Sequence, residues 1–142
     1  MDARSTGHCL CGAVSYEVHG PLRDILLCHC EECRRWIGGV GAFTATREDD
    51  LTFVQDRGLR WVASPRSDRH ARRAFCGECG SSLFWRPADG ERIHIAAGSL
   101  DPPTGLHVAG HWYTHQADEW DEPADDALPK DSELSGMEIP WR

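Results

Sequence analysis

Seven cysteines fall into three short clusters in this 142-residue chain, and their number and spacing restrict how it can fold. An odd number of cysteines cannot pair completely into disulfides, and clustered cysteines in a reducing compartment more often bind metal. The chain has neither the ~20-residue apolar segment of a membrane helix nor the N-terminal apolar core of a secretion signal. We therefore expect a cytoplasmic protein with one folded domain, reduced metal-binding thiols and no membrane partner.

Two of the clusters are cysteine pairs that glycine follows directly: Cys9 and Cys11 in C-L-C-G, and Cys76 and Cys79 in C-G-E-C-G. On an extended segment, a C-x-C pair places both side chains on one face, and a C-x-x-C-G turn lets two thiolates converge on one metal. Either pair alone could be free thiols, but together they supply a complete tetrahedral set. The sequence predicts a closed, structural four-cysteine zinc site that stabilises the fold directly.

The third cluster, Cys28, Cys30 and Cys33, offers three thiols where a tetrahedral zinc needs four ligands. Three protein ligands and one open position are typical of catalytic zinc, and the open position suits a further thiolate. His29 lies between two of these cysteines and would point the other way on a strand. Two alternatives remain: an iron–sulfur cluster on four of the cysteines, or a fourth ligand from a distant histidine. The candidate histidines are His107, His111 and His115.

Short strand-like segments dominate the rest of the chain. Residues 13–18, 51–54 and 92–98 alternate between apolar and polar, and three further segments are rich in β-branched or aromatic residues. These further segments are 40–47, 59–63 and 82–85. The sequence EECRRWI at 31–37, which two glycines follow, is the predicted helix. The pattern predicts a mainly β fold with one or two short helical turns.

The net charge of −8 is concentrated near the C-terminus, because residues 117–142 carry nine acidic and two basic groups. The body is close to neutral, which argues against a nucleic-acid partner, since neutralising phosphates dominates such binding. We predict a domain at 1–122 and a loosely ordered acidic tail at 123–142. Trp120 and Trp141 could attach parts of this acidic region to the body.

Four motifs in order resemble the glutathione-dependent formaldehyde-activating enzyme family, whose domain is also found in centromere protein V. They are GHCLCGAVSYEV, CHCEECRRW, RRAFCGECGSSLFW and HIAAGSLDPPTGLHV. In combination these motifs are highly specific, and the resemblance covers residues 6–122. It implies a β-tent-like zinc fold of short antiparallel sheets with one or two short helical turns.

The resemblance also implies two zinc ions per chain with different roles. A structural zinc would be held by Cys9, Cys11, Cys76 and Cys79, and a catalytic zinc by Cys28, Cys30 and Cys33. The family joins formaldehyde to glutathione, giving S-hydroxymethylglutathione, which is a carbon–sulfur lyase reaction run in reverse. The implied partners are therefore glutathione or a similar thiol, and formaldehyde or another small aldehyde, with the thiol activated at the three-cysteine site.

Glutathione carries two carboxylates, which arginine binds with paired hydrogen bonds. Arg34 and Arg35 follow the third cysteine cluster, and Arg72 and Arg73 precede Cys76, so all four are candidates. Of these, we select Arg34, Arg35 and Arg73 as the predicted substrate ligands. In an acidic chain, however, arginines more often form ordinary surface ion pairs. A second hypothesis follows from the lack of an evident general base near the cysteines: a non-catalytic, zinc-stabilised thiol carrier or protein-binding module. The sequence leaves the oligomeric state open.

Overall fold

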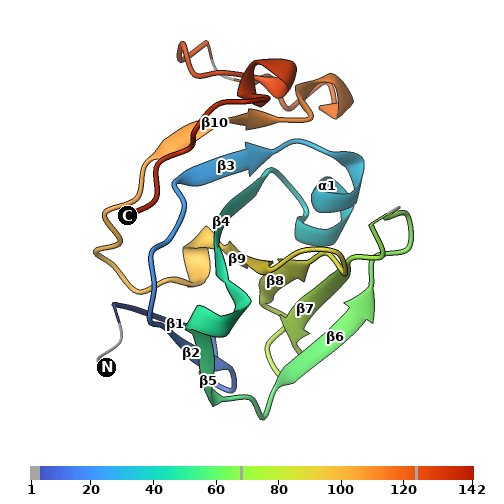
Figure 1. Cartoon of the computed structure of the whole chain (residues 1–142). Coiled ribbons are helices and arrows are strands. Elements are labelled where there is room, and N and C mark those ends of the chain that lie inside the picture. Colours follow the sequence, from blue (N-terminus) through green and yellow to red (C-terminus); the bar gives the residue numbers. More distant parts are fainter. Residues whose placement is uncertain (1–3, 68, 124) are drawn as a thin grey trace.

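The computed structural model describes residues 4–67, 69–123 and 125–142, so parts of the predicted 1–122 domain and 123–142 tail lie outside the described residues. The mainly β fold is confirmed (Figure 1). The described residues form ten strands: β1 (Ser5–His8), β2 (Ser15–Val18), β3 (Ile25–Cys28), β4 (Gly41–Arg47), β5 (Leu51–Gln55), β6 (Leu59–Ala63), β7 (Arg72–Cys76), β8 (Ser82–Arg86), β9 (Arg92–Ala96) and β10 (Val108–Trp112). The helical elements are α1 (Glu31–Ile37) and the short 3-10 turns η1 (Glu48–Asp50), η2 (Ala97–Ser99), η3 (Thr114–Gln116) and η4 (Asp131–Leu134).

The strands form two sheets of different size. The smaller sheet has the order β1-β2-β5, and the larger has the order β10-β3-β4-β9-β8-β7-β6. Neighbouring strands of these sheets run antiparallel except β10 and β3, which are parallel and have a bulge between Val108 and Gly110. The expected short antiparallel sheets are therefore only part of the architecture. The parallel pair arises because the chain passes through the whole of the larger sheet before β10 returns beside β3.

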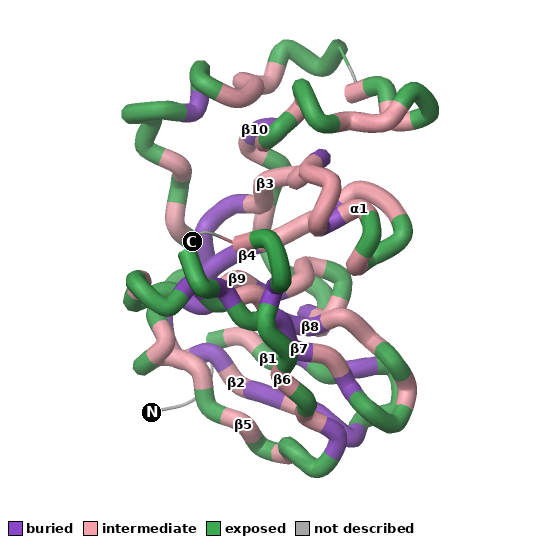
Figure 2. Tube along the Cα trace, turned by 90° about the vertical axis from the view of Figure 1, so that its right-hand side faces the viewer, coloured by how far each residue is buried: buried purple, intermediate pink, exposed green. Residues whose placement is uncertain are grey.

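The core lies where the small sheet packs against the strands β6 to β9 of the large one, seen as the buried segments in Figure 2. Phe84 of β8 lies at its centre. The centroid of its ring is 5.2 Å from that of Tyr16 in β2, 5.6 Å from that of Phe53 in β5 and 6.2 Å from that of Trp61 in β6. Burying these rings and their aliphatic neighbours supplies the main favourable term for folding. This packing also sets the turn after β1 beside the turn after β7.

The helix α1 coincides with the predicted segment 31–37. Cys30 is its N-cap, and the Cys30 Sγ accepts a hydrogen bond from the Cys33 N–H at 3.3 Å. Gly38 ends the helix with φ of 86°, the left-handed conformation that glycine adopts without steric cost. The helix therefore begins at one cysteine and carries another in its first turn.

The C-terminal segment packs on the body, in contrast to the expectation of a loosely ordered tail. Leu134 is buried and lies over Gly110, where an added Cβ would come within 2.7 Å of the Leu134 side chain. Arg142 donates two hydrogen bonds to the buried Asp24, at 2.9 and 3.0 Å. Trp141 stacks under the Arg92 guanidinium at 4.8 Å, whereas Trp120 is largely exposed. Apolar and ionic contacts that are distant in sequence hold this segment, so its composition alone did not reveal them.

None of the helices in the described part of the chain is long and apolar enough to cross a membrane.

Candidate metal centres and cavity

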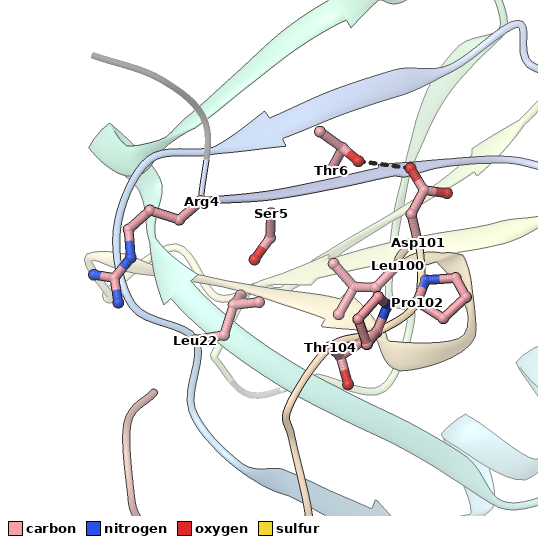
Figure 3. A pocket seen from close by; sticks show the side chains of 9 residues that line it. Arg4, Ser5, Thr6, Leu22, Leu100, Asp101, Pro102 and Thr104 are labelled. Carbon is pink, nitrogen blue, oxygen red and sulfur yellow. Dashed lines mark hydrogen bonds between the residues drawn. The ribbon is translucent and has the colours of Figure 1, made fainter.

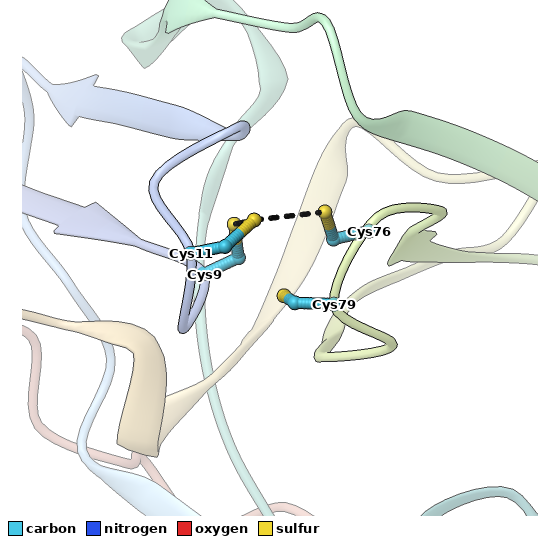
Figure 4. A group of neighbouring side chains, drawn as sticks. All are labelled: Cys9, Cys11, Cys76 and Cys79. Carbon is cyan, nitrogen blue, oxygen red and sulfur yellow. Dashed lines mark hydrogen bonds between the residues drawn. The ribbon is translucent and has the colours of Figure 1, made fainter.

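The first two cysteine pairs converge on one point, as predicted. The sulfur atoms of Cys9, Cys11, Cys76 and Cys79 all lie within 4.8 Å of one another. Figure 4 shows the two pairs facing each other from separate turns. The Cys11 Sγ is 3.8 Å from both the Cys9 Sγ and the Cys76 Sγ. A tetrahedral zinc with Zn–S bonds of ~2.3 Å places its sulfurs ~3.8 Å apart, so this set fits a metal of that size and geometry.

The backbone around this cluster explains how it is built. Cys9 and Cys11 lie in the turn between β1 and β2, not on the extended segment that the C-x-C spacing predicted. The turn closes by a hydrogen bond from the Gly12 N–H to the Cys9 carbonyl at 3.2 Å, with Gly12 at φ of 83°. The Val14 N–H donates to the Cys9 Sγ at 3.2 Å. Two hydrogen bonds from Ser81 lower the pKa of Cys79 to about 5, which favours its thiolate.

The other three cysteines also converge. Cys28 ends β3, Cys30 caps α1 and Cys33 lies in its first turn, and their sulfurs all lie within 4.8 Å of one another. The strand geometry from which His29 was expected to point away from the cysteines does not extend this far, because β3 stops at Cys28. Cys30 still has an extended backbone, with φ of −68° and ψ of 156°, so its sulfur turns towards the same point.

The electrostatics of the three-cysteine cluster favour a bound cation. Hydrogen bonds with Cys28 and Cys33 lower the pKa of Cys30, whereas interactions with Cys30 and Cys33 raise the pKa of Cys28. Without a bound cation, the cluster thus favours the thiolate of Cys30 and disfavours that of Cys28, because two negative charges at this distance repel each other. A divalent ion relieves that repulsion, and thiolates suit zinc among the common metals. The cluster therefore fits a metal with three protein ligands.

This cluster lines a cavity of about 690 Å³. The side chains of Trp112, Tyr113 and Arg73 also line it. Arg73 is 4% exposed, and its two terminal nitrogens lie 3.8 and 3.9 Å from the Cys33 Sγ. Its Nε donates to the Ser64 Oγ at 3.1 Å, which holds the guanidinium in place. A buried cation is thus aimed at one of the three sulfurs.

The predicted substrate arginines divide into two groups. Arg73 lines the cavity. Arg34 and Arg35 belong to α1 but do not line it; they pair instead with Asp118 at 3.3 Å and Glu31 at 3.0 Å. In α1, the positions that follow Cys33 turn away from the cavity as the helix advances by ~100° per residue.

The histidines considered as fourth ligands are engaged elsewhere or lie outside the cavity. His29 is buried, with its Nδ1 2.7 Å from the Asp121 carboxylate and its Nε2 3.0 Å from the His111 Nδ1. The His111 Nε2 in turn lies 2.8 Å from the Asp126 carboxylate. This chain of polar contacts ties the acidic C-terminal segment to β10 and to the residue that follows β3. His107 and His115 do not line the cavity.

Four basic residues of the cavity were missed by the sequence reasoning: Arg23, Arg66, Arg69 and His94. Arg23 precedes β3 and is 7% exposed, and His94 lies in the middle of β9. Both line the same cavity as the cysteines. His94 belongs to a segment whose alternation predicted a strand, so its place on the face opposite the buried Ile93 and Ile95 could have been anticipated. Arg23 lies in no motif, and only the tertiary fold brings it to the site.

A second, smaller cavity of about 230 Å³ lies between β1 and the loop after η2 (Figure 3). Thr6 donates a hydrogen bond to Asp101 at its edge, at 2.7 Å. No cysteine or histidine is among the described residues that line it. It lacks the nucleophilic and metal-binding groups of the larger cavity, which is therefore the candidate functional site.

Comparison with known proteins agrees with this arrangement. The family model for the glutathione-dependent formaldehyde-activating enzyme matches residues 4–116. The chain belongs to this family. All seven cysteines lie inside the matched region, whereas residues 117–142, which supply the carboxylates that contact His29 and His111, lie outside it.

Two relatives and one solved structure show how far the similarity within the formaldehyde-activating family extends. A Halomonas elongata protein that is assigned by name to the glutathione-dependent formaldehyde-activating enzymes is 30% identical over 118 residues, or 72% of each chain. An uncharacterized lyase of Schizosaccharomyces pombe is 29% identical over 90 residues, which span 63% of this chain and 62% of that protein. A crystal structure of a Rhodobacter sphaeroides protein matches with a TM-score of 0.56 and 27% identity, over 75% of this chain and 98% of the other.

Proposed function

We propose that this protein is a zinc-dependent carbon–sulfur lyase that joins a thiol, glutathione or a similar molecule, to formaldehyde or another small aldehyde. The observation that carries the proposal is the set of three convergent sulfurs in the wall of an open cavity large enough for a tripeptide. Family membership supports a glutathione-related lyase. The proposal places the protein in a reducing compartment such as the cytoplasm, where its seven thiols stay free to bind metal.

The proposal assigns two zinc ions to each chain, one to each cysteine set. Cys9, Cys11, Cys76 and Cys79 form a complete tetrahedral set for a structural ion, whereas Cys28, Cys30 and Cys33 leave room for one exogenous ligand. A zinc ion at the second site would lower the pKa of a thiol bound to it, so that the thiol is nucleophilic near neutral pH. In the reaction a bond forms between the substrate sulfur and the carbonyl carbon of the aldehyde, and the thiol proton ends on the carbonyl oxygen.

The residues of the chain orient the substrate and balance charge at this site. Cys28, Cys30 and Cys33 fix where the substrate sulfur can lie. Arg73 adds a buried positive charge next to Cys33 and offers its guanidinium to an anionic substrate. The cavity walls of Trp112 and Tyr113 shield the reacting atoms from part of the solvent.

The test is the variant Cys33→Ser in the zinc-loaded protein. We expect native mass spectrometry to find one zinc ion fewer than in the wild type, and we expect the acceleration of S-hydroxymethylglutathione formation to vanish. The thermal unfolding midpoint should change little, because the structural site is elsewhere. The control Cys79→Ser should also lose one ion but should lose stability with it. Undiminished acceleration by Cys33→Ser would contradict the proposal.

A second candidate is a thiol carrier without turnover. It is favoured by the state of the two carboxylates in the cavity wall: Glu31 pairs with Arg66 at 2.8 Å, and Glu32 accepts a hydrogen bond from the Ser64 hydroxyl at 2.9 Å. Hydrogen bonds from Arg35 and Arg66 lower the pKa of Glu31, which makes it a weaker base. If glutathione binds the three-cysteine zinc but adduct formation is no faster than in buffer, the carrier function holds in place of the lyase.

A further inference from the structure

We propose that Arg23, with Arg69 in the wall of the same cavity, forms a carboxylate-binding subsite at the end of the cavity away from the three cysteines. This inference rests on the proposed function, since it assigns the class of thiol that the site takes: one whose carboxylate lies several bonds from its sulfur. Arg23, Arg69 and the three cysteines all line the same cavity.

The strand register separates the two ends of the cavity. Cys28 of β3 pairs with Gly41 of β4, whereas the Arg23 N–H donates to the Ala45 carbonyl at 3.0 Å. His94 of β9 pairs with the same Ala45. Four residues of β4 therefore separate the cysteine end from the Arg23 end, which corresponds to ~13 Å along the strand. The Arg23 side chain reaches back towards the cysteines, because its Nη2 donates to the carbonyl of Phe43, which is two residues from Gly41. Along the strand this leaves ~7 Å, the scale of a small peptide.

Arg23 is a buried cation without an acidic partner among the described residues. Its side chain is more than nine-tenths buried, its Nε donates to the Asp24 carbonyl at 3.2 Å, and its Nη2 donates to the Phe43 carbonyl at 3.1 Å. These two bonds fix the plane of the guanidinium. In the same part of the chain, Nη1 has no hydrogen-bond partner and no carboxylate pairs with Arg23. A buried charge is costly unless it is paired, so a ligand that brings a carboxylate would complete the site.

The surroundings of Arg23 strengthen the preference for an anion. Burial, together with the neighbouring charges of Arg23, Arg69 and Arg92, lowers the pKa of His94 to about 3, so this imidazole is neutral at physiological pH. The guanidinium carbon of Arg69 lies 5.5 Å from the centroid of the Trp85 ring. The rings of Trp85 and His94 pack in a T-shaped arrangement, with their centroids 4.8 Å apart. Among the described residues, the carboxylate that pairs with Arg69 is that of the exposed Asp89, at 3.2 Å. The field at this end of the cavity is therefore positive.

The ligand class follows from both ends together. The cysteine end, loaded with metal, takes a thiol sulfur, and the Arg23 end takes a carboxylate with a charge-assisted hydrogen bond from the free Nη1 of a fixed guanidinium. A thiol with no carboxylate can occupy only the first end. Anionic peptide-like thiols should therefore bind more tightly than neutral thiols of equal reactivity.

S-methylglutathione separates the two ends, because its methylated sulfur is no longer a thiol while both carboxylates remain. We expect isothermal titration calorimetry on the zinc-loaded protein to show that Arg23→Gln weakens S-methylglutathione binding by roughly tenfold to a hundredfold, the range for a charge-assisted pair. Binding of 2-mercaptoethanol, a thiol with no carboxylate, should be unchanged. The control Arg57→Gln removes an exposed arginine that pairs with Glu78 outside the cavity and should leave both affinities unchanged.

A ligand series on the wild type keeps the inference testable if Arg23→Gln does not fold. Glutathione diethyl ester has the same thiol but no free carboxylate, and it should bind at least roughly tenfold more weakly than glutathione. Equal affinity for the two would overturn the carboxylate subsite while leaving the lyase proposal intact. Preserved carboxylate selectivity without any acceleration of adduct formation would overturn the lyase proposal and keep the subsite.

Discussion

Gly58 allows a direct test of the four-cysteine cluster as a metal site that shapes the fold. It follows β5, and its N–H donates to the Ala13 carbonyl at 3.0 Å, while its own carbonyl accepts from the Gly77 N–H at 2.7 Å. It therefore joins the two turns that carry the four cysteines. A Cβ added at this position would lie 2.6 Å from the Cys76 Sγ and 2.9 Å from the Ala13 Cβ.

The expected cost of Gly58→Ala follows from these distances. Nonbonded carbon contacts lie at ~3.5–4.0 Å, so the Cys76 sulfur or the backbone must move by about 1 Å. Metal–ligand distances tolerate only about ±0.2 Å, so the shift should lower zinc occupancy. Overpacking of this kind costs about 2 kcal/mol. For a chain of this size we expect the unfolding midpoint to fall by on the order of 8 °C.

The assay is thermal unfolding by circular dichroism, with zinc counted by native mass spectrometry. Gly98→Ala is the matched control, because a Cβ there meets no atom within 4 Å. It should retain both ions and unfold at or slightly above the wild-type temperature, since alanine reduces the entropy of the unfolded chain. A Gly58→Ala protein with two zinc ions and the wild-type midpoint would refute the argument that close packing at Cys76 holds the structural site.

Three further predictions concern the C-terminal segment and the metals. Leu134→Ala should lower the free energy of unfolding by about 3 kcal/mol in urea titrations, because it opens a hole over β10, whereas the exposed Met137→Ala should change it little. Burial alone would raise the pKa of Asp24, but hydrogen bonds from Arg142 and the His107 N–H lower it overall, so this carboxyl stabilises the fold above its unfolded pKa of ~3.9. That contribution should be lost as the pH falls through the lower pKa that Asp24 has in the folded protein. The urea midpoint of Asp24→Asn should therefore depend less on pH below 4 than that of the wild type. Equal pH dependence of the two proteins would show that the pair of Asp24 and Arg142 is unimportant. A chelator titration should remove the ion of the three-cysteine site first, because that site has fewer protein ligands, so activity should vanish before the unfolding temperature changes. If activity and the unfolding temperature fell together, the two cysteine sites would not have separate catalytic and structural roles.

The cysteine partition and the helix could be predicted from the sequence, because their causes are local or carried by spacing. The C-x-C-G and C-x-x-C-G motifs marked the four-cysteine set, and EECRRWI with its following glycines marked α1 at its observed bounds. The strand at 92–96 followed from alternation. In each of these cases the signal lies within a few residues, where backbone geometry and ligand chemistry leave little choice.

The other properties of the site depend on contacts between residues that are far apart in the chain. Arg23 carries no motif, and it reaches the cavity because β3 pairs with β4 and β9 lies next to β4. Leu134 and the His29–His111 pair bring an acidic, tail-like segment onto β10, although its composition favours disorder. The sequence by itself determined which atoms can hold metal, since ligand type and spacing are covalent properties of the chain. Only the tertiary structure decided which charges face those atoms, because long-range packing sets that geometry.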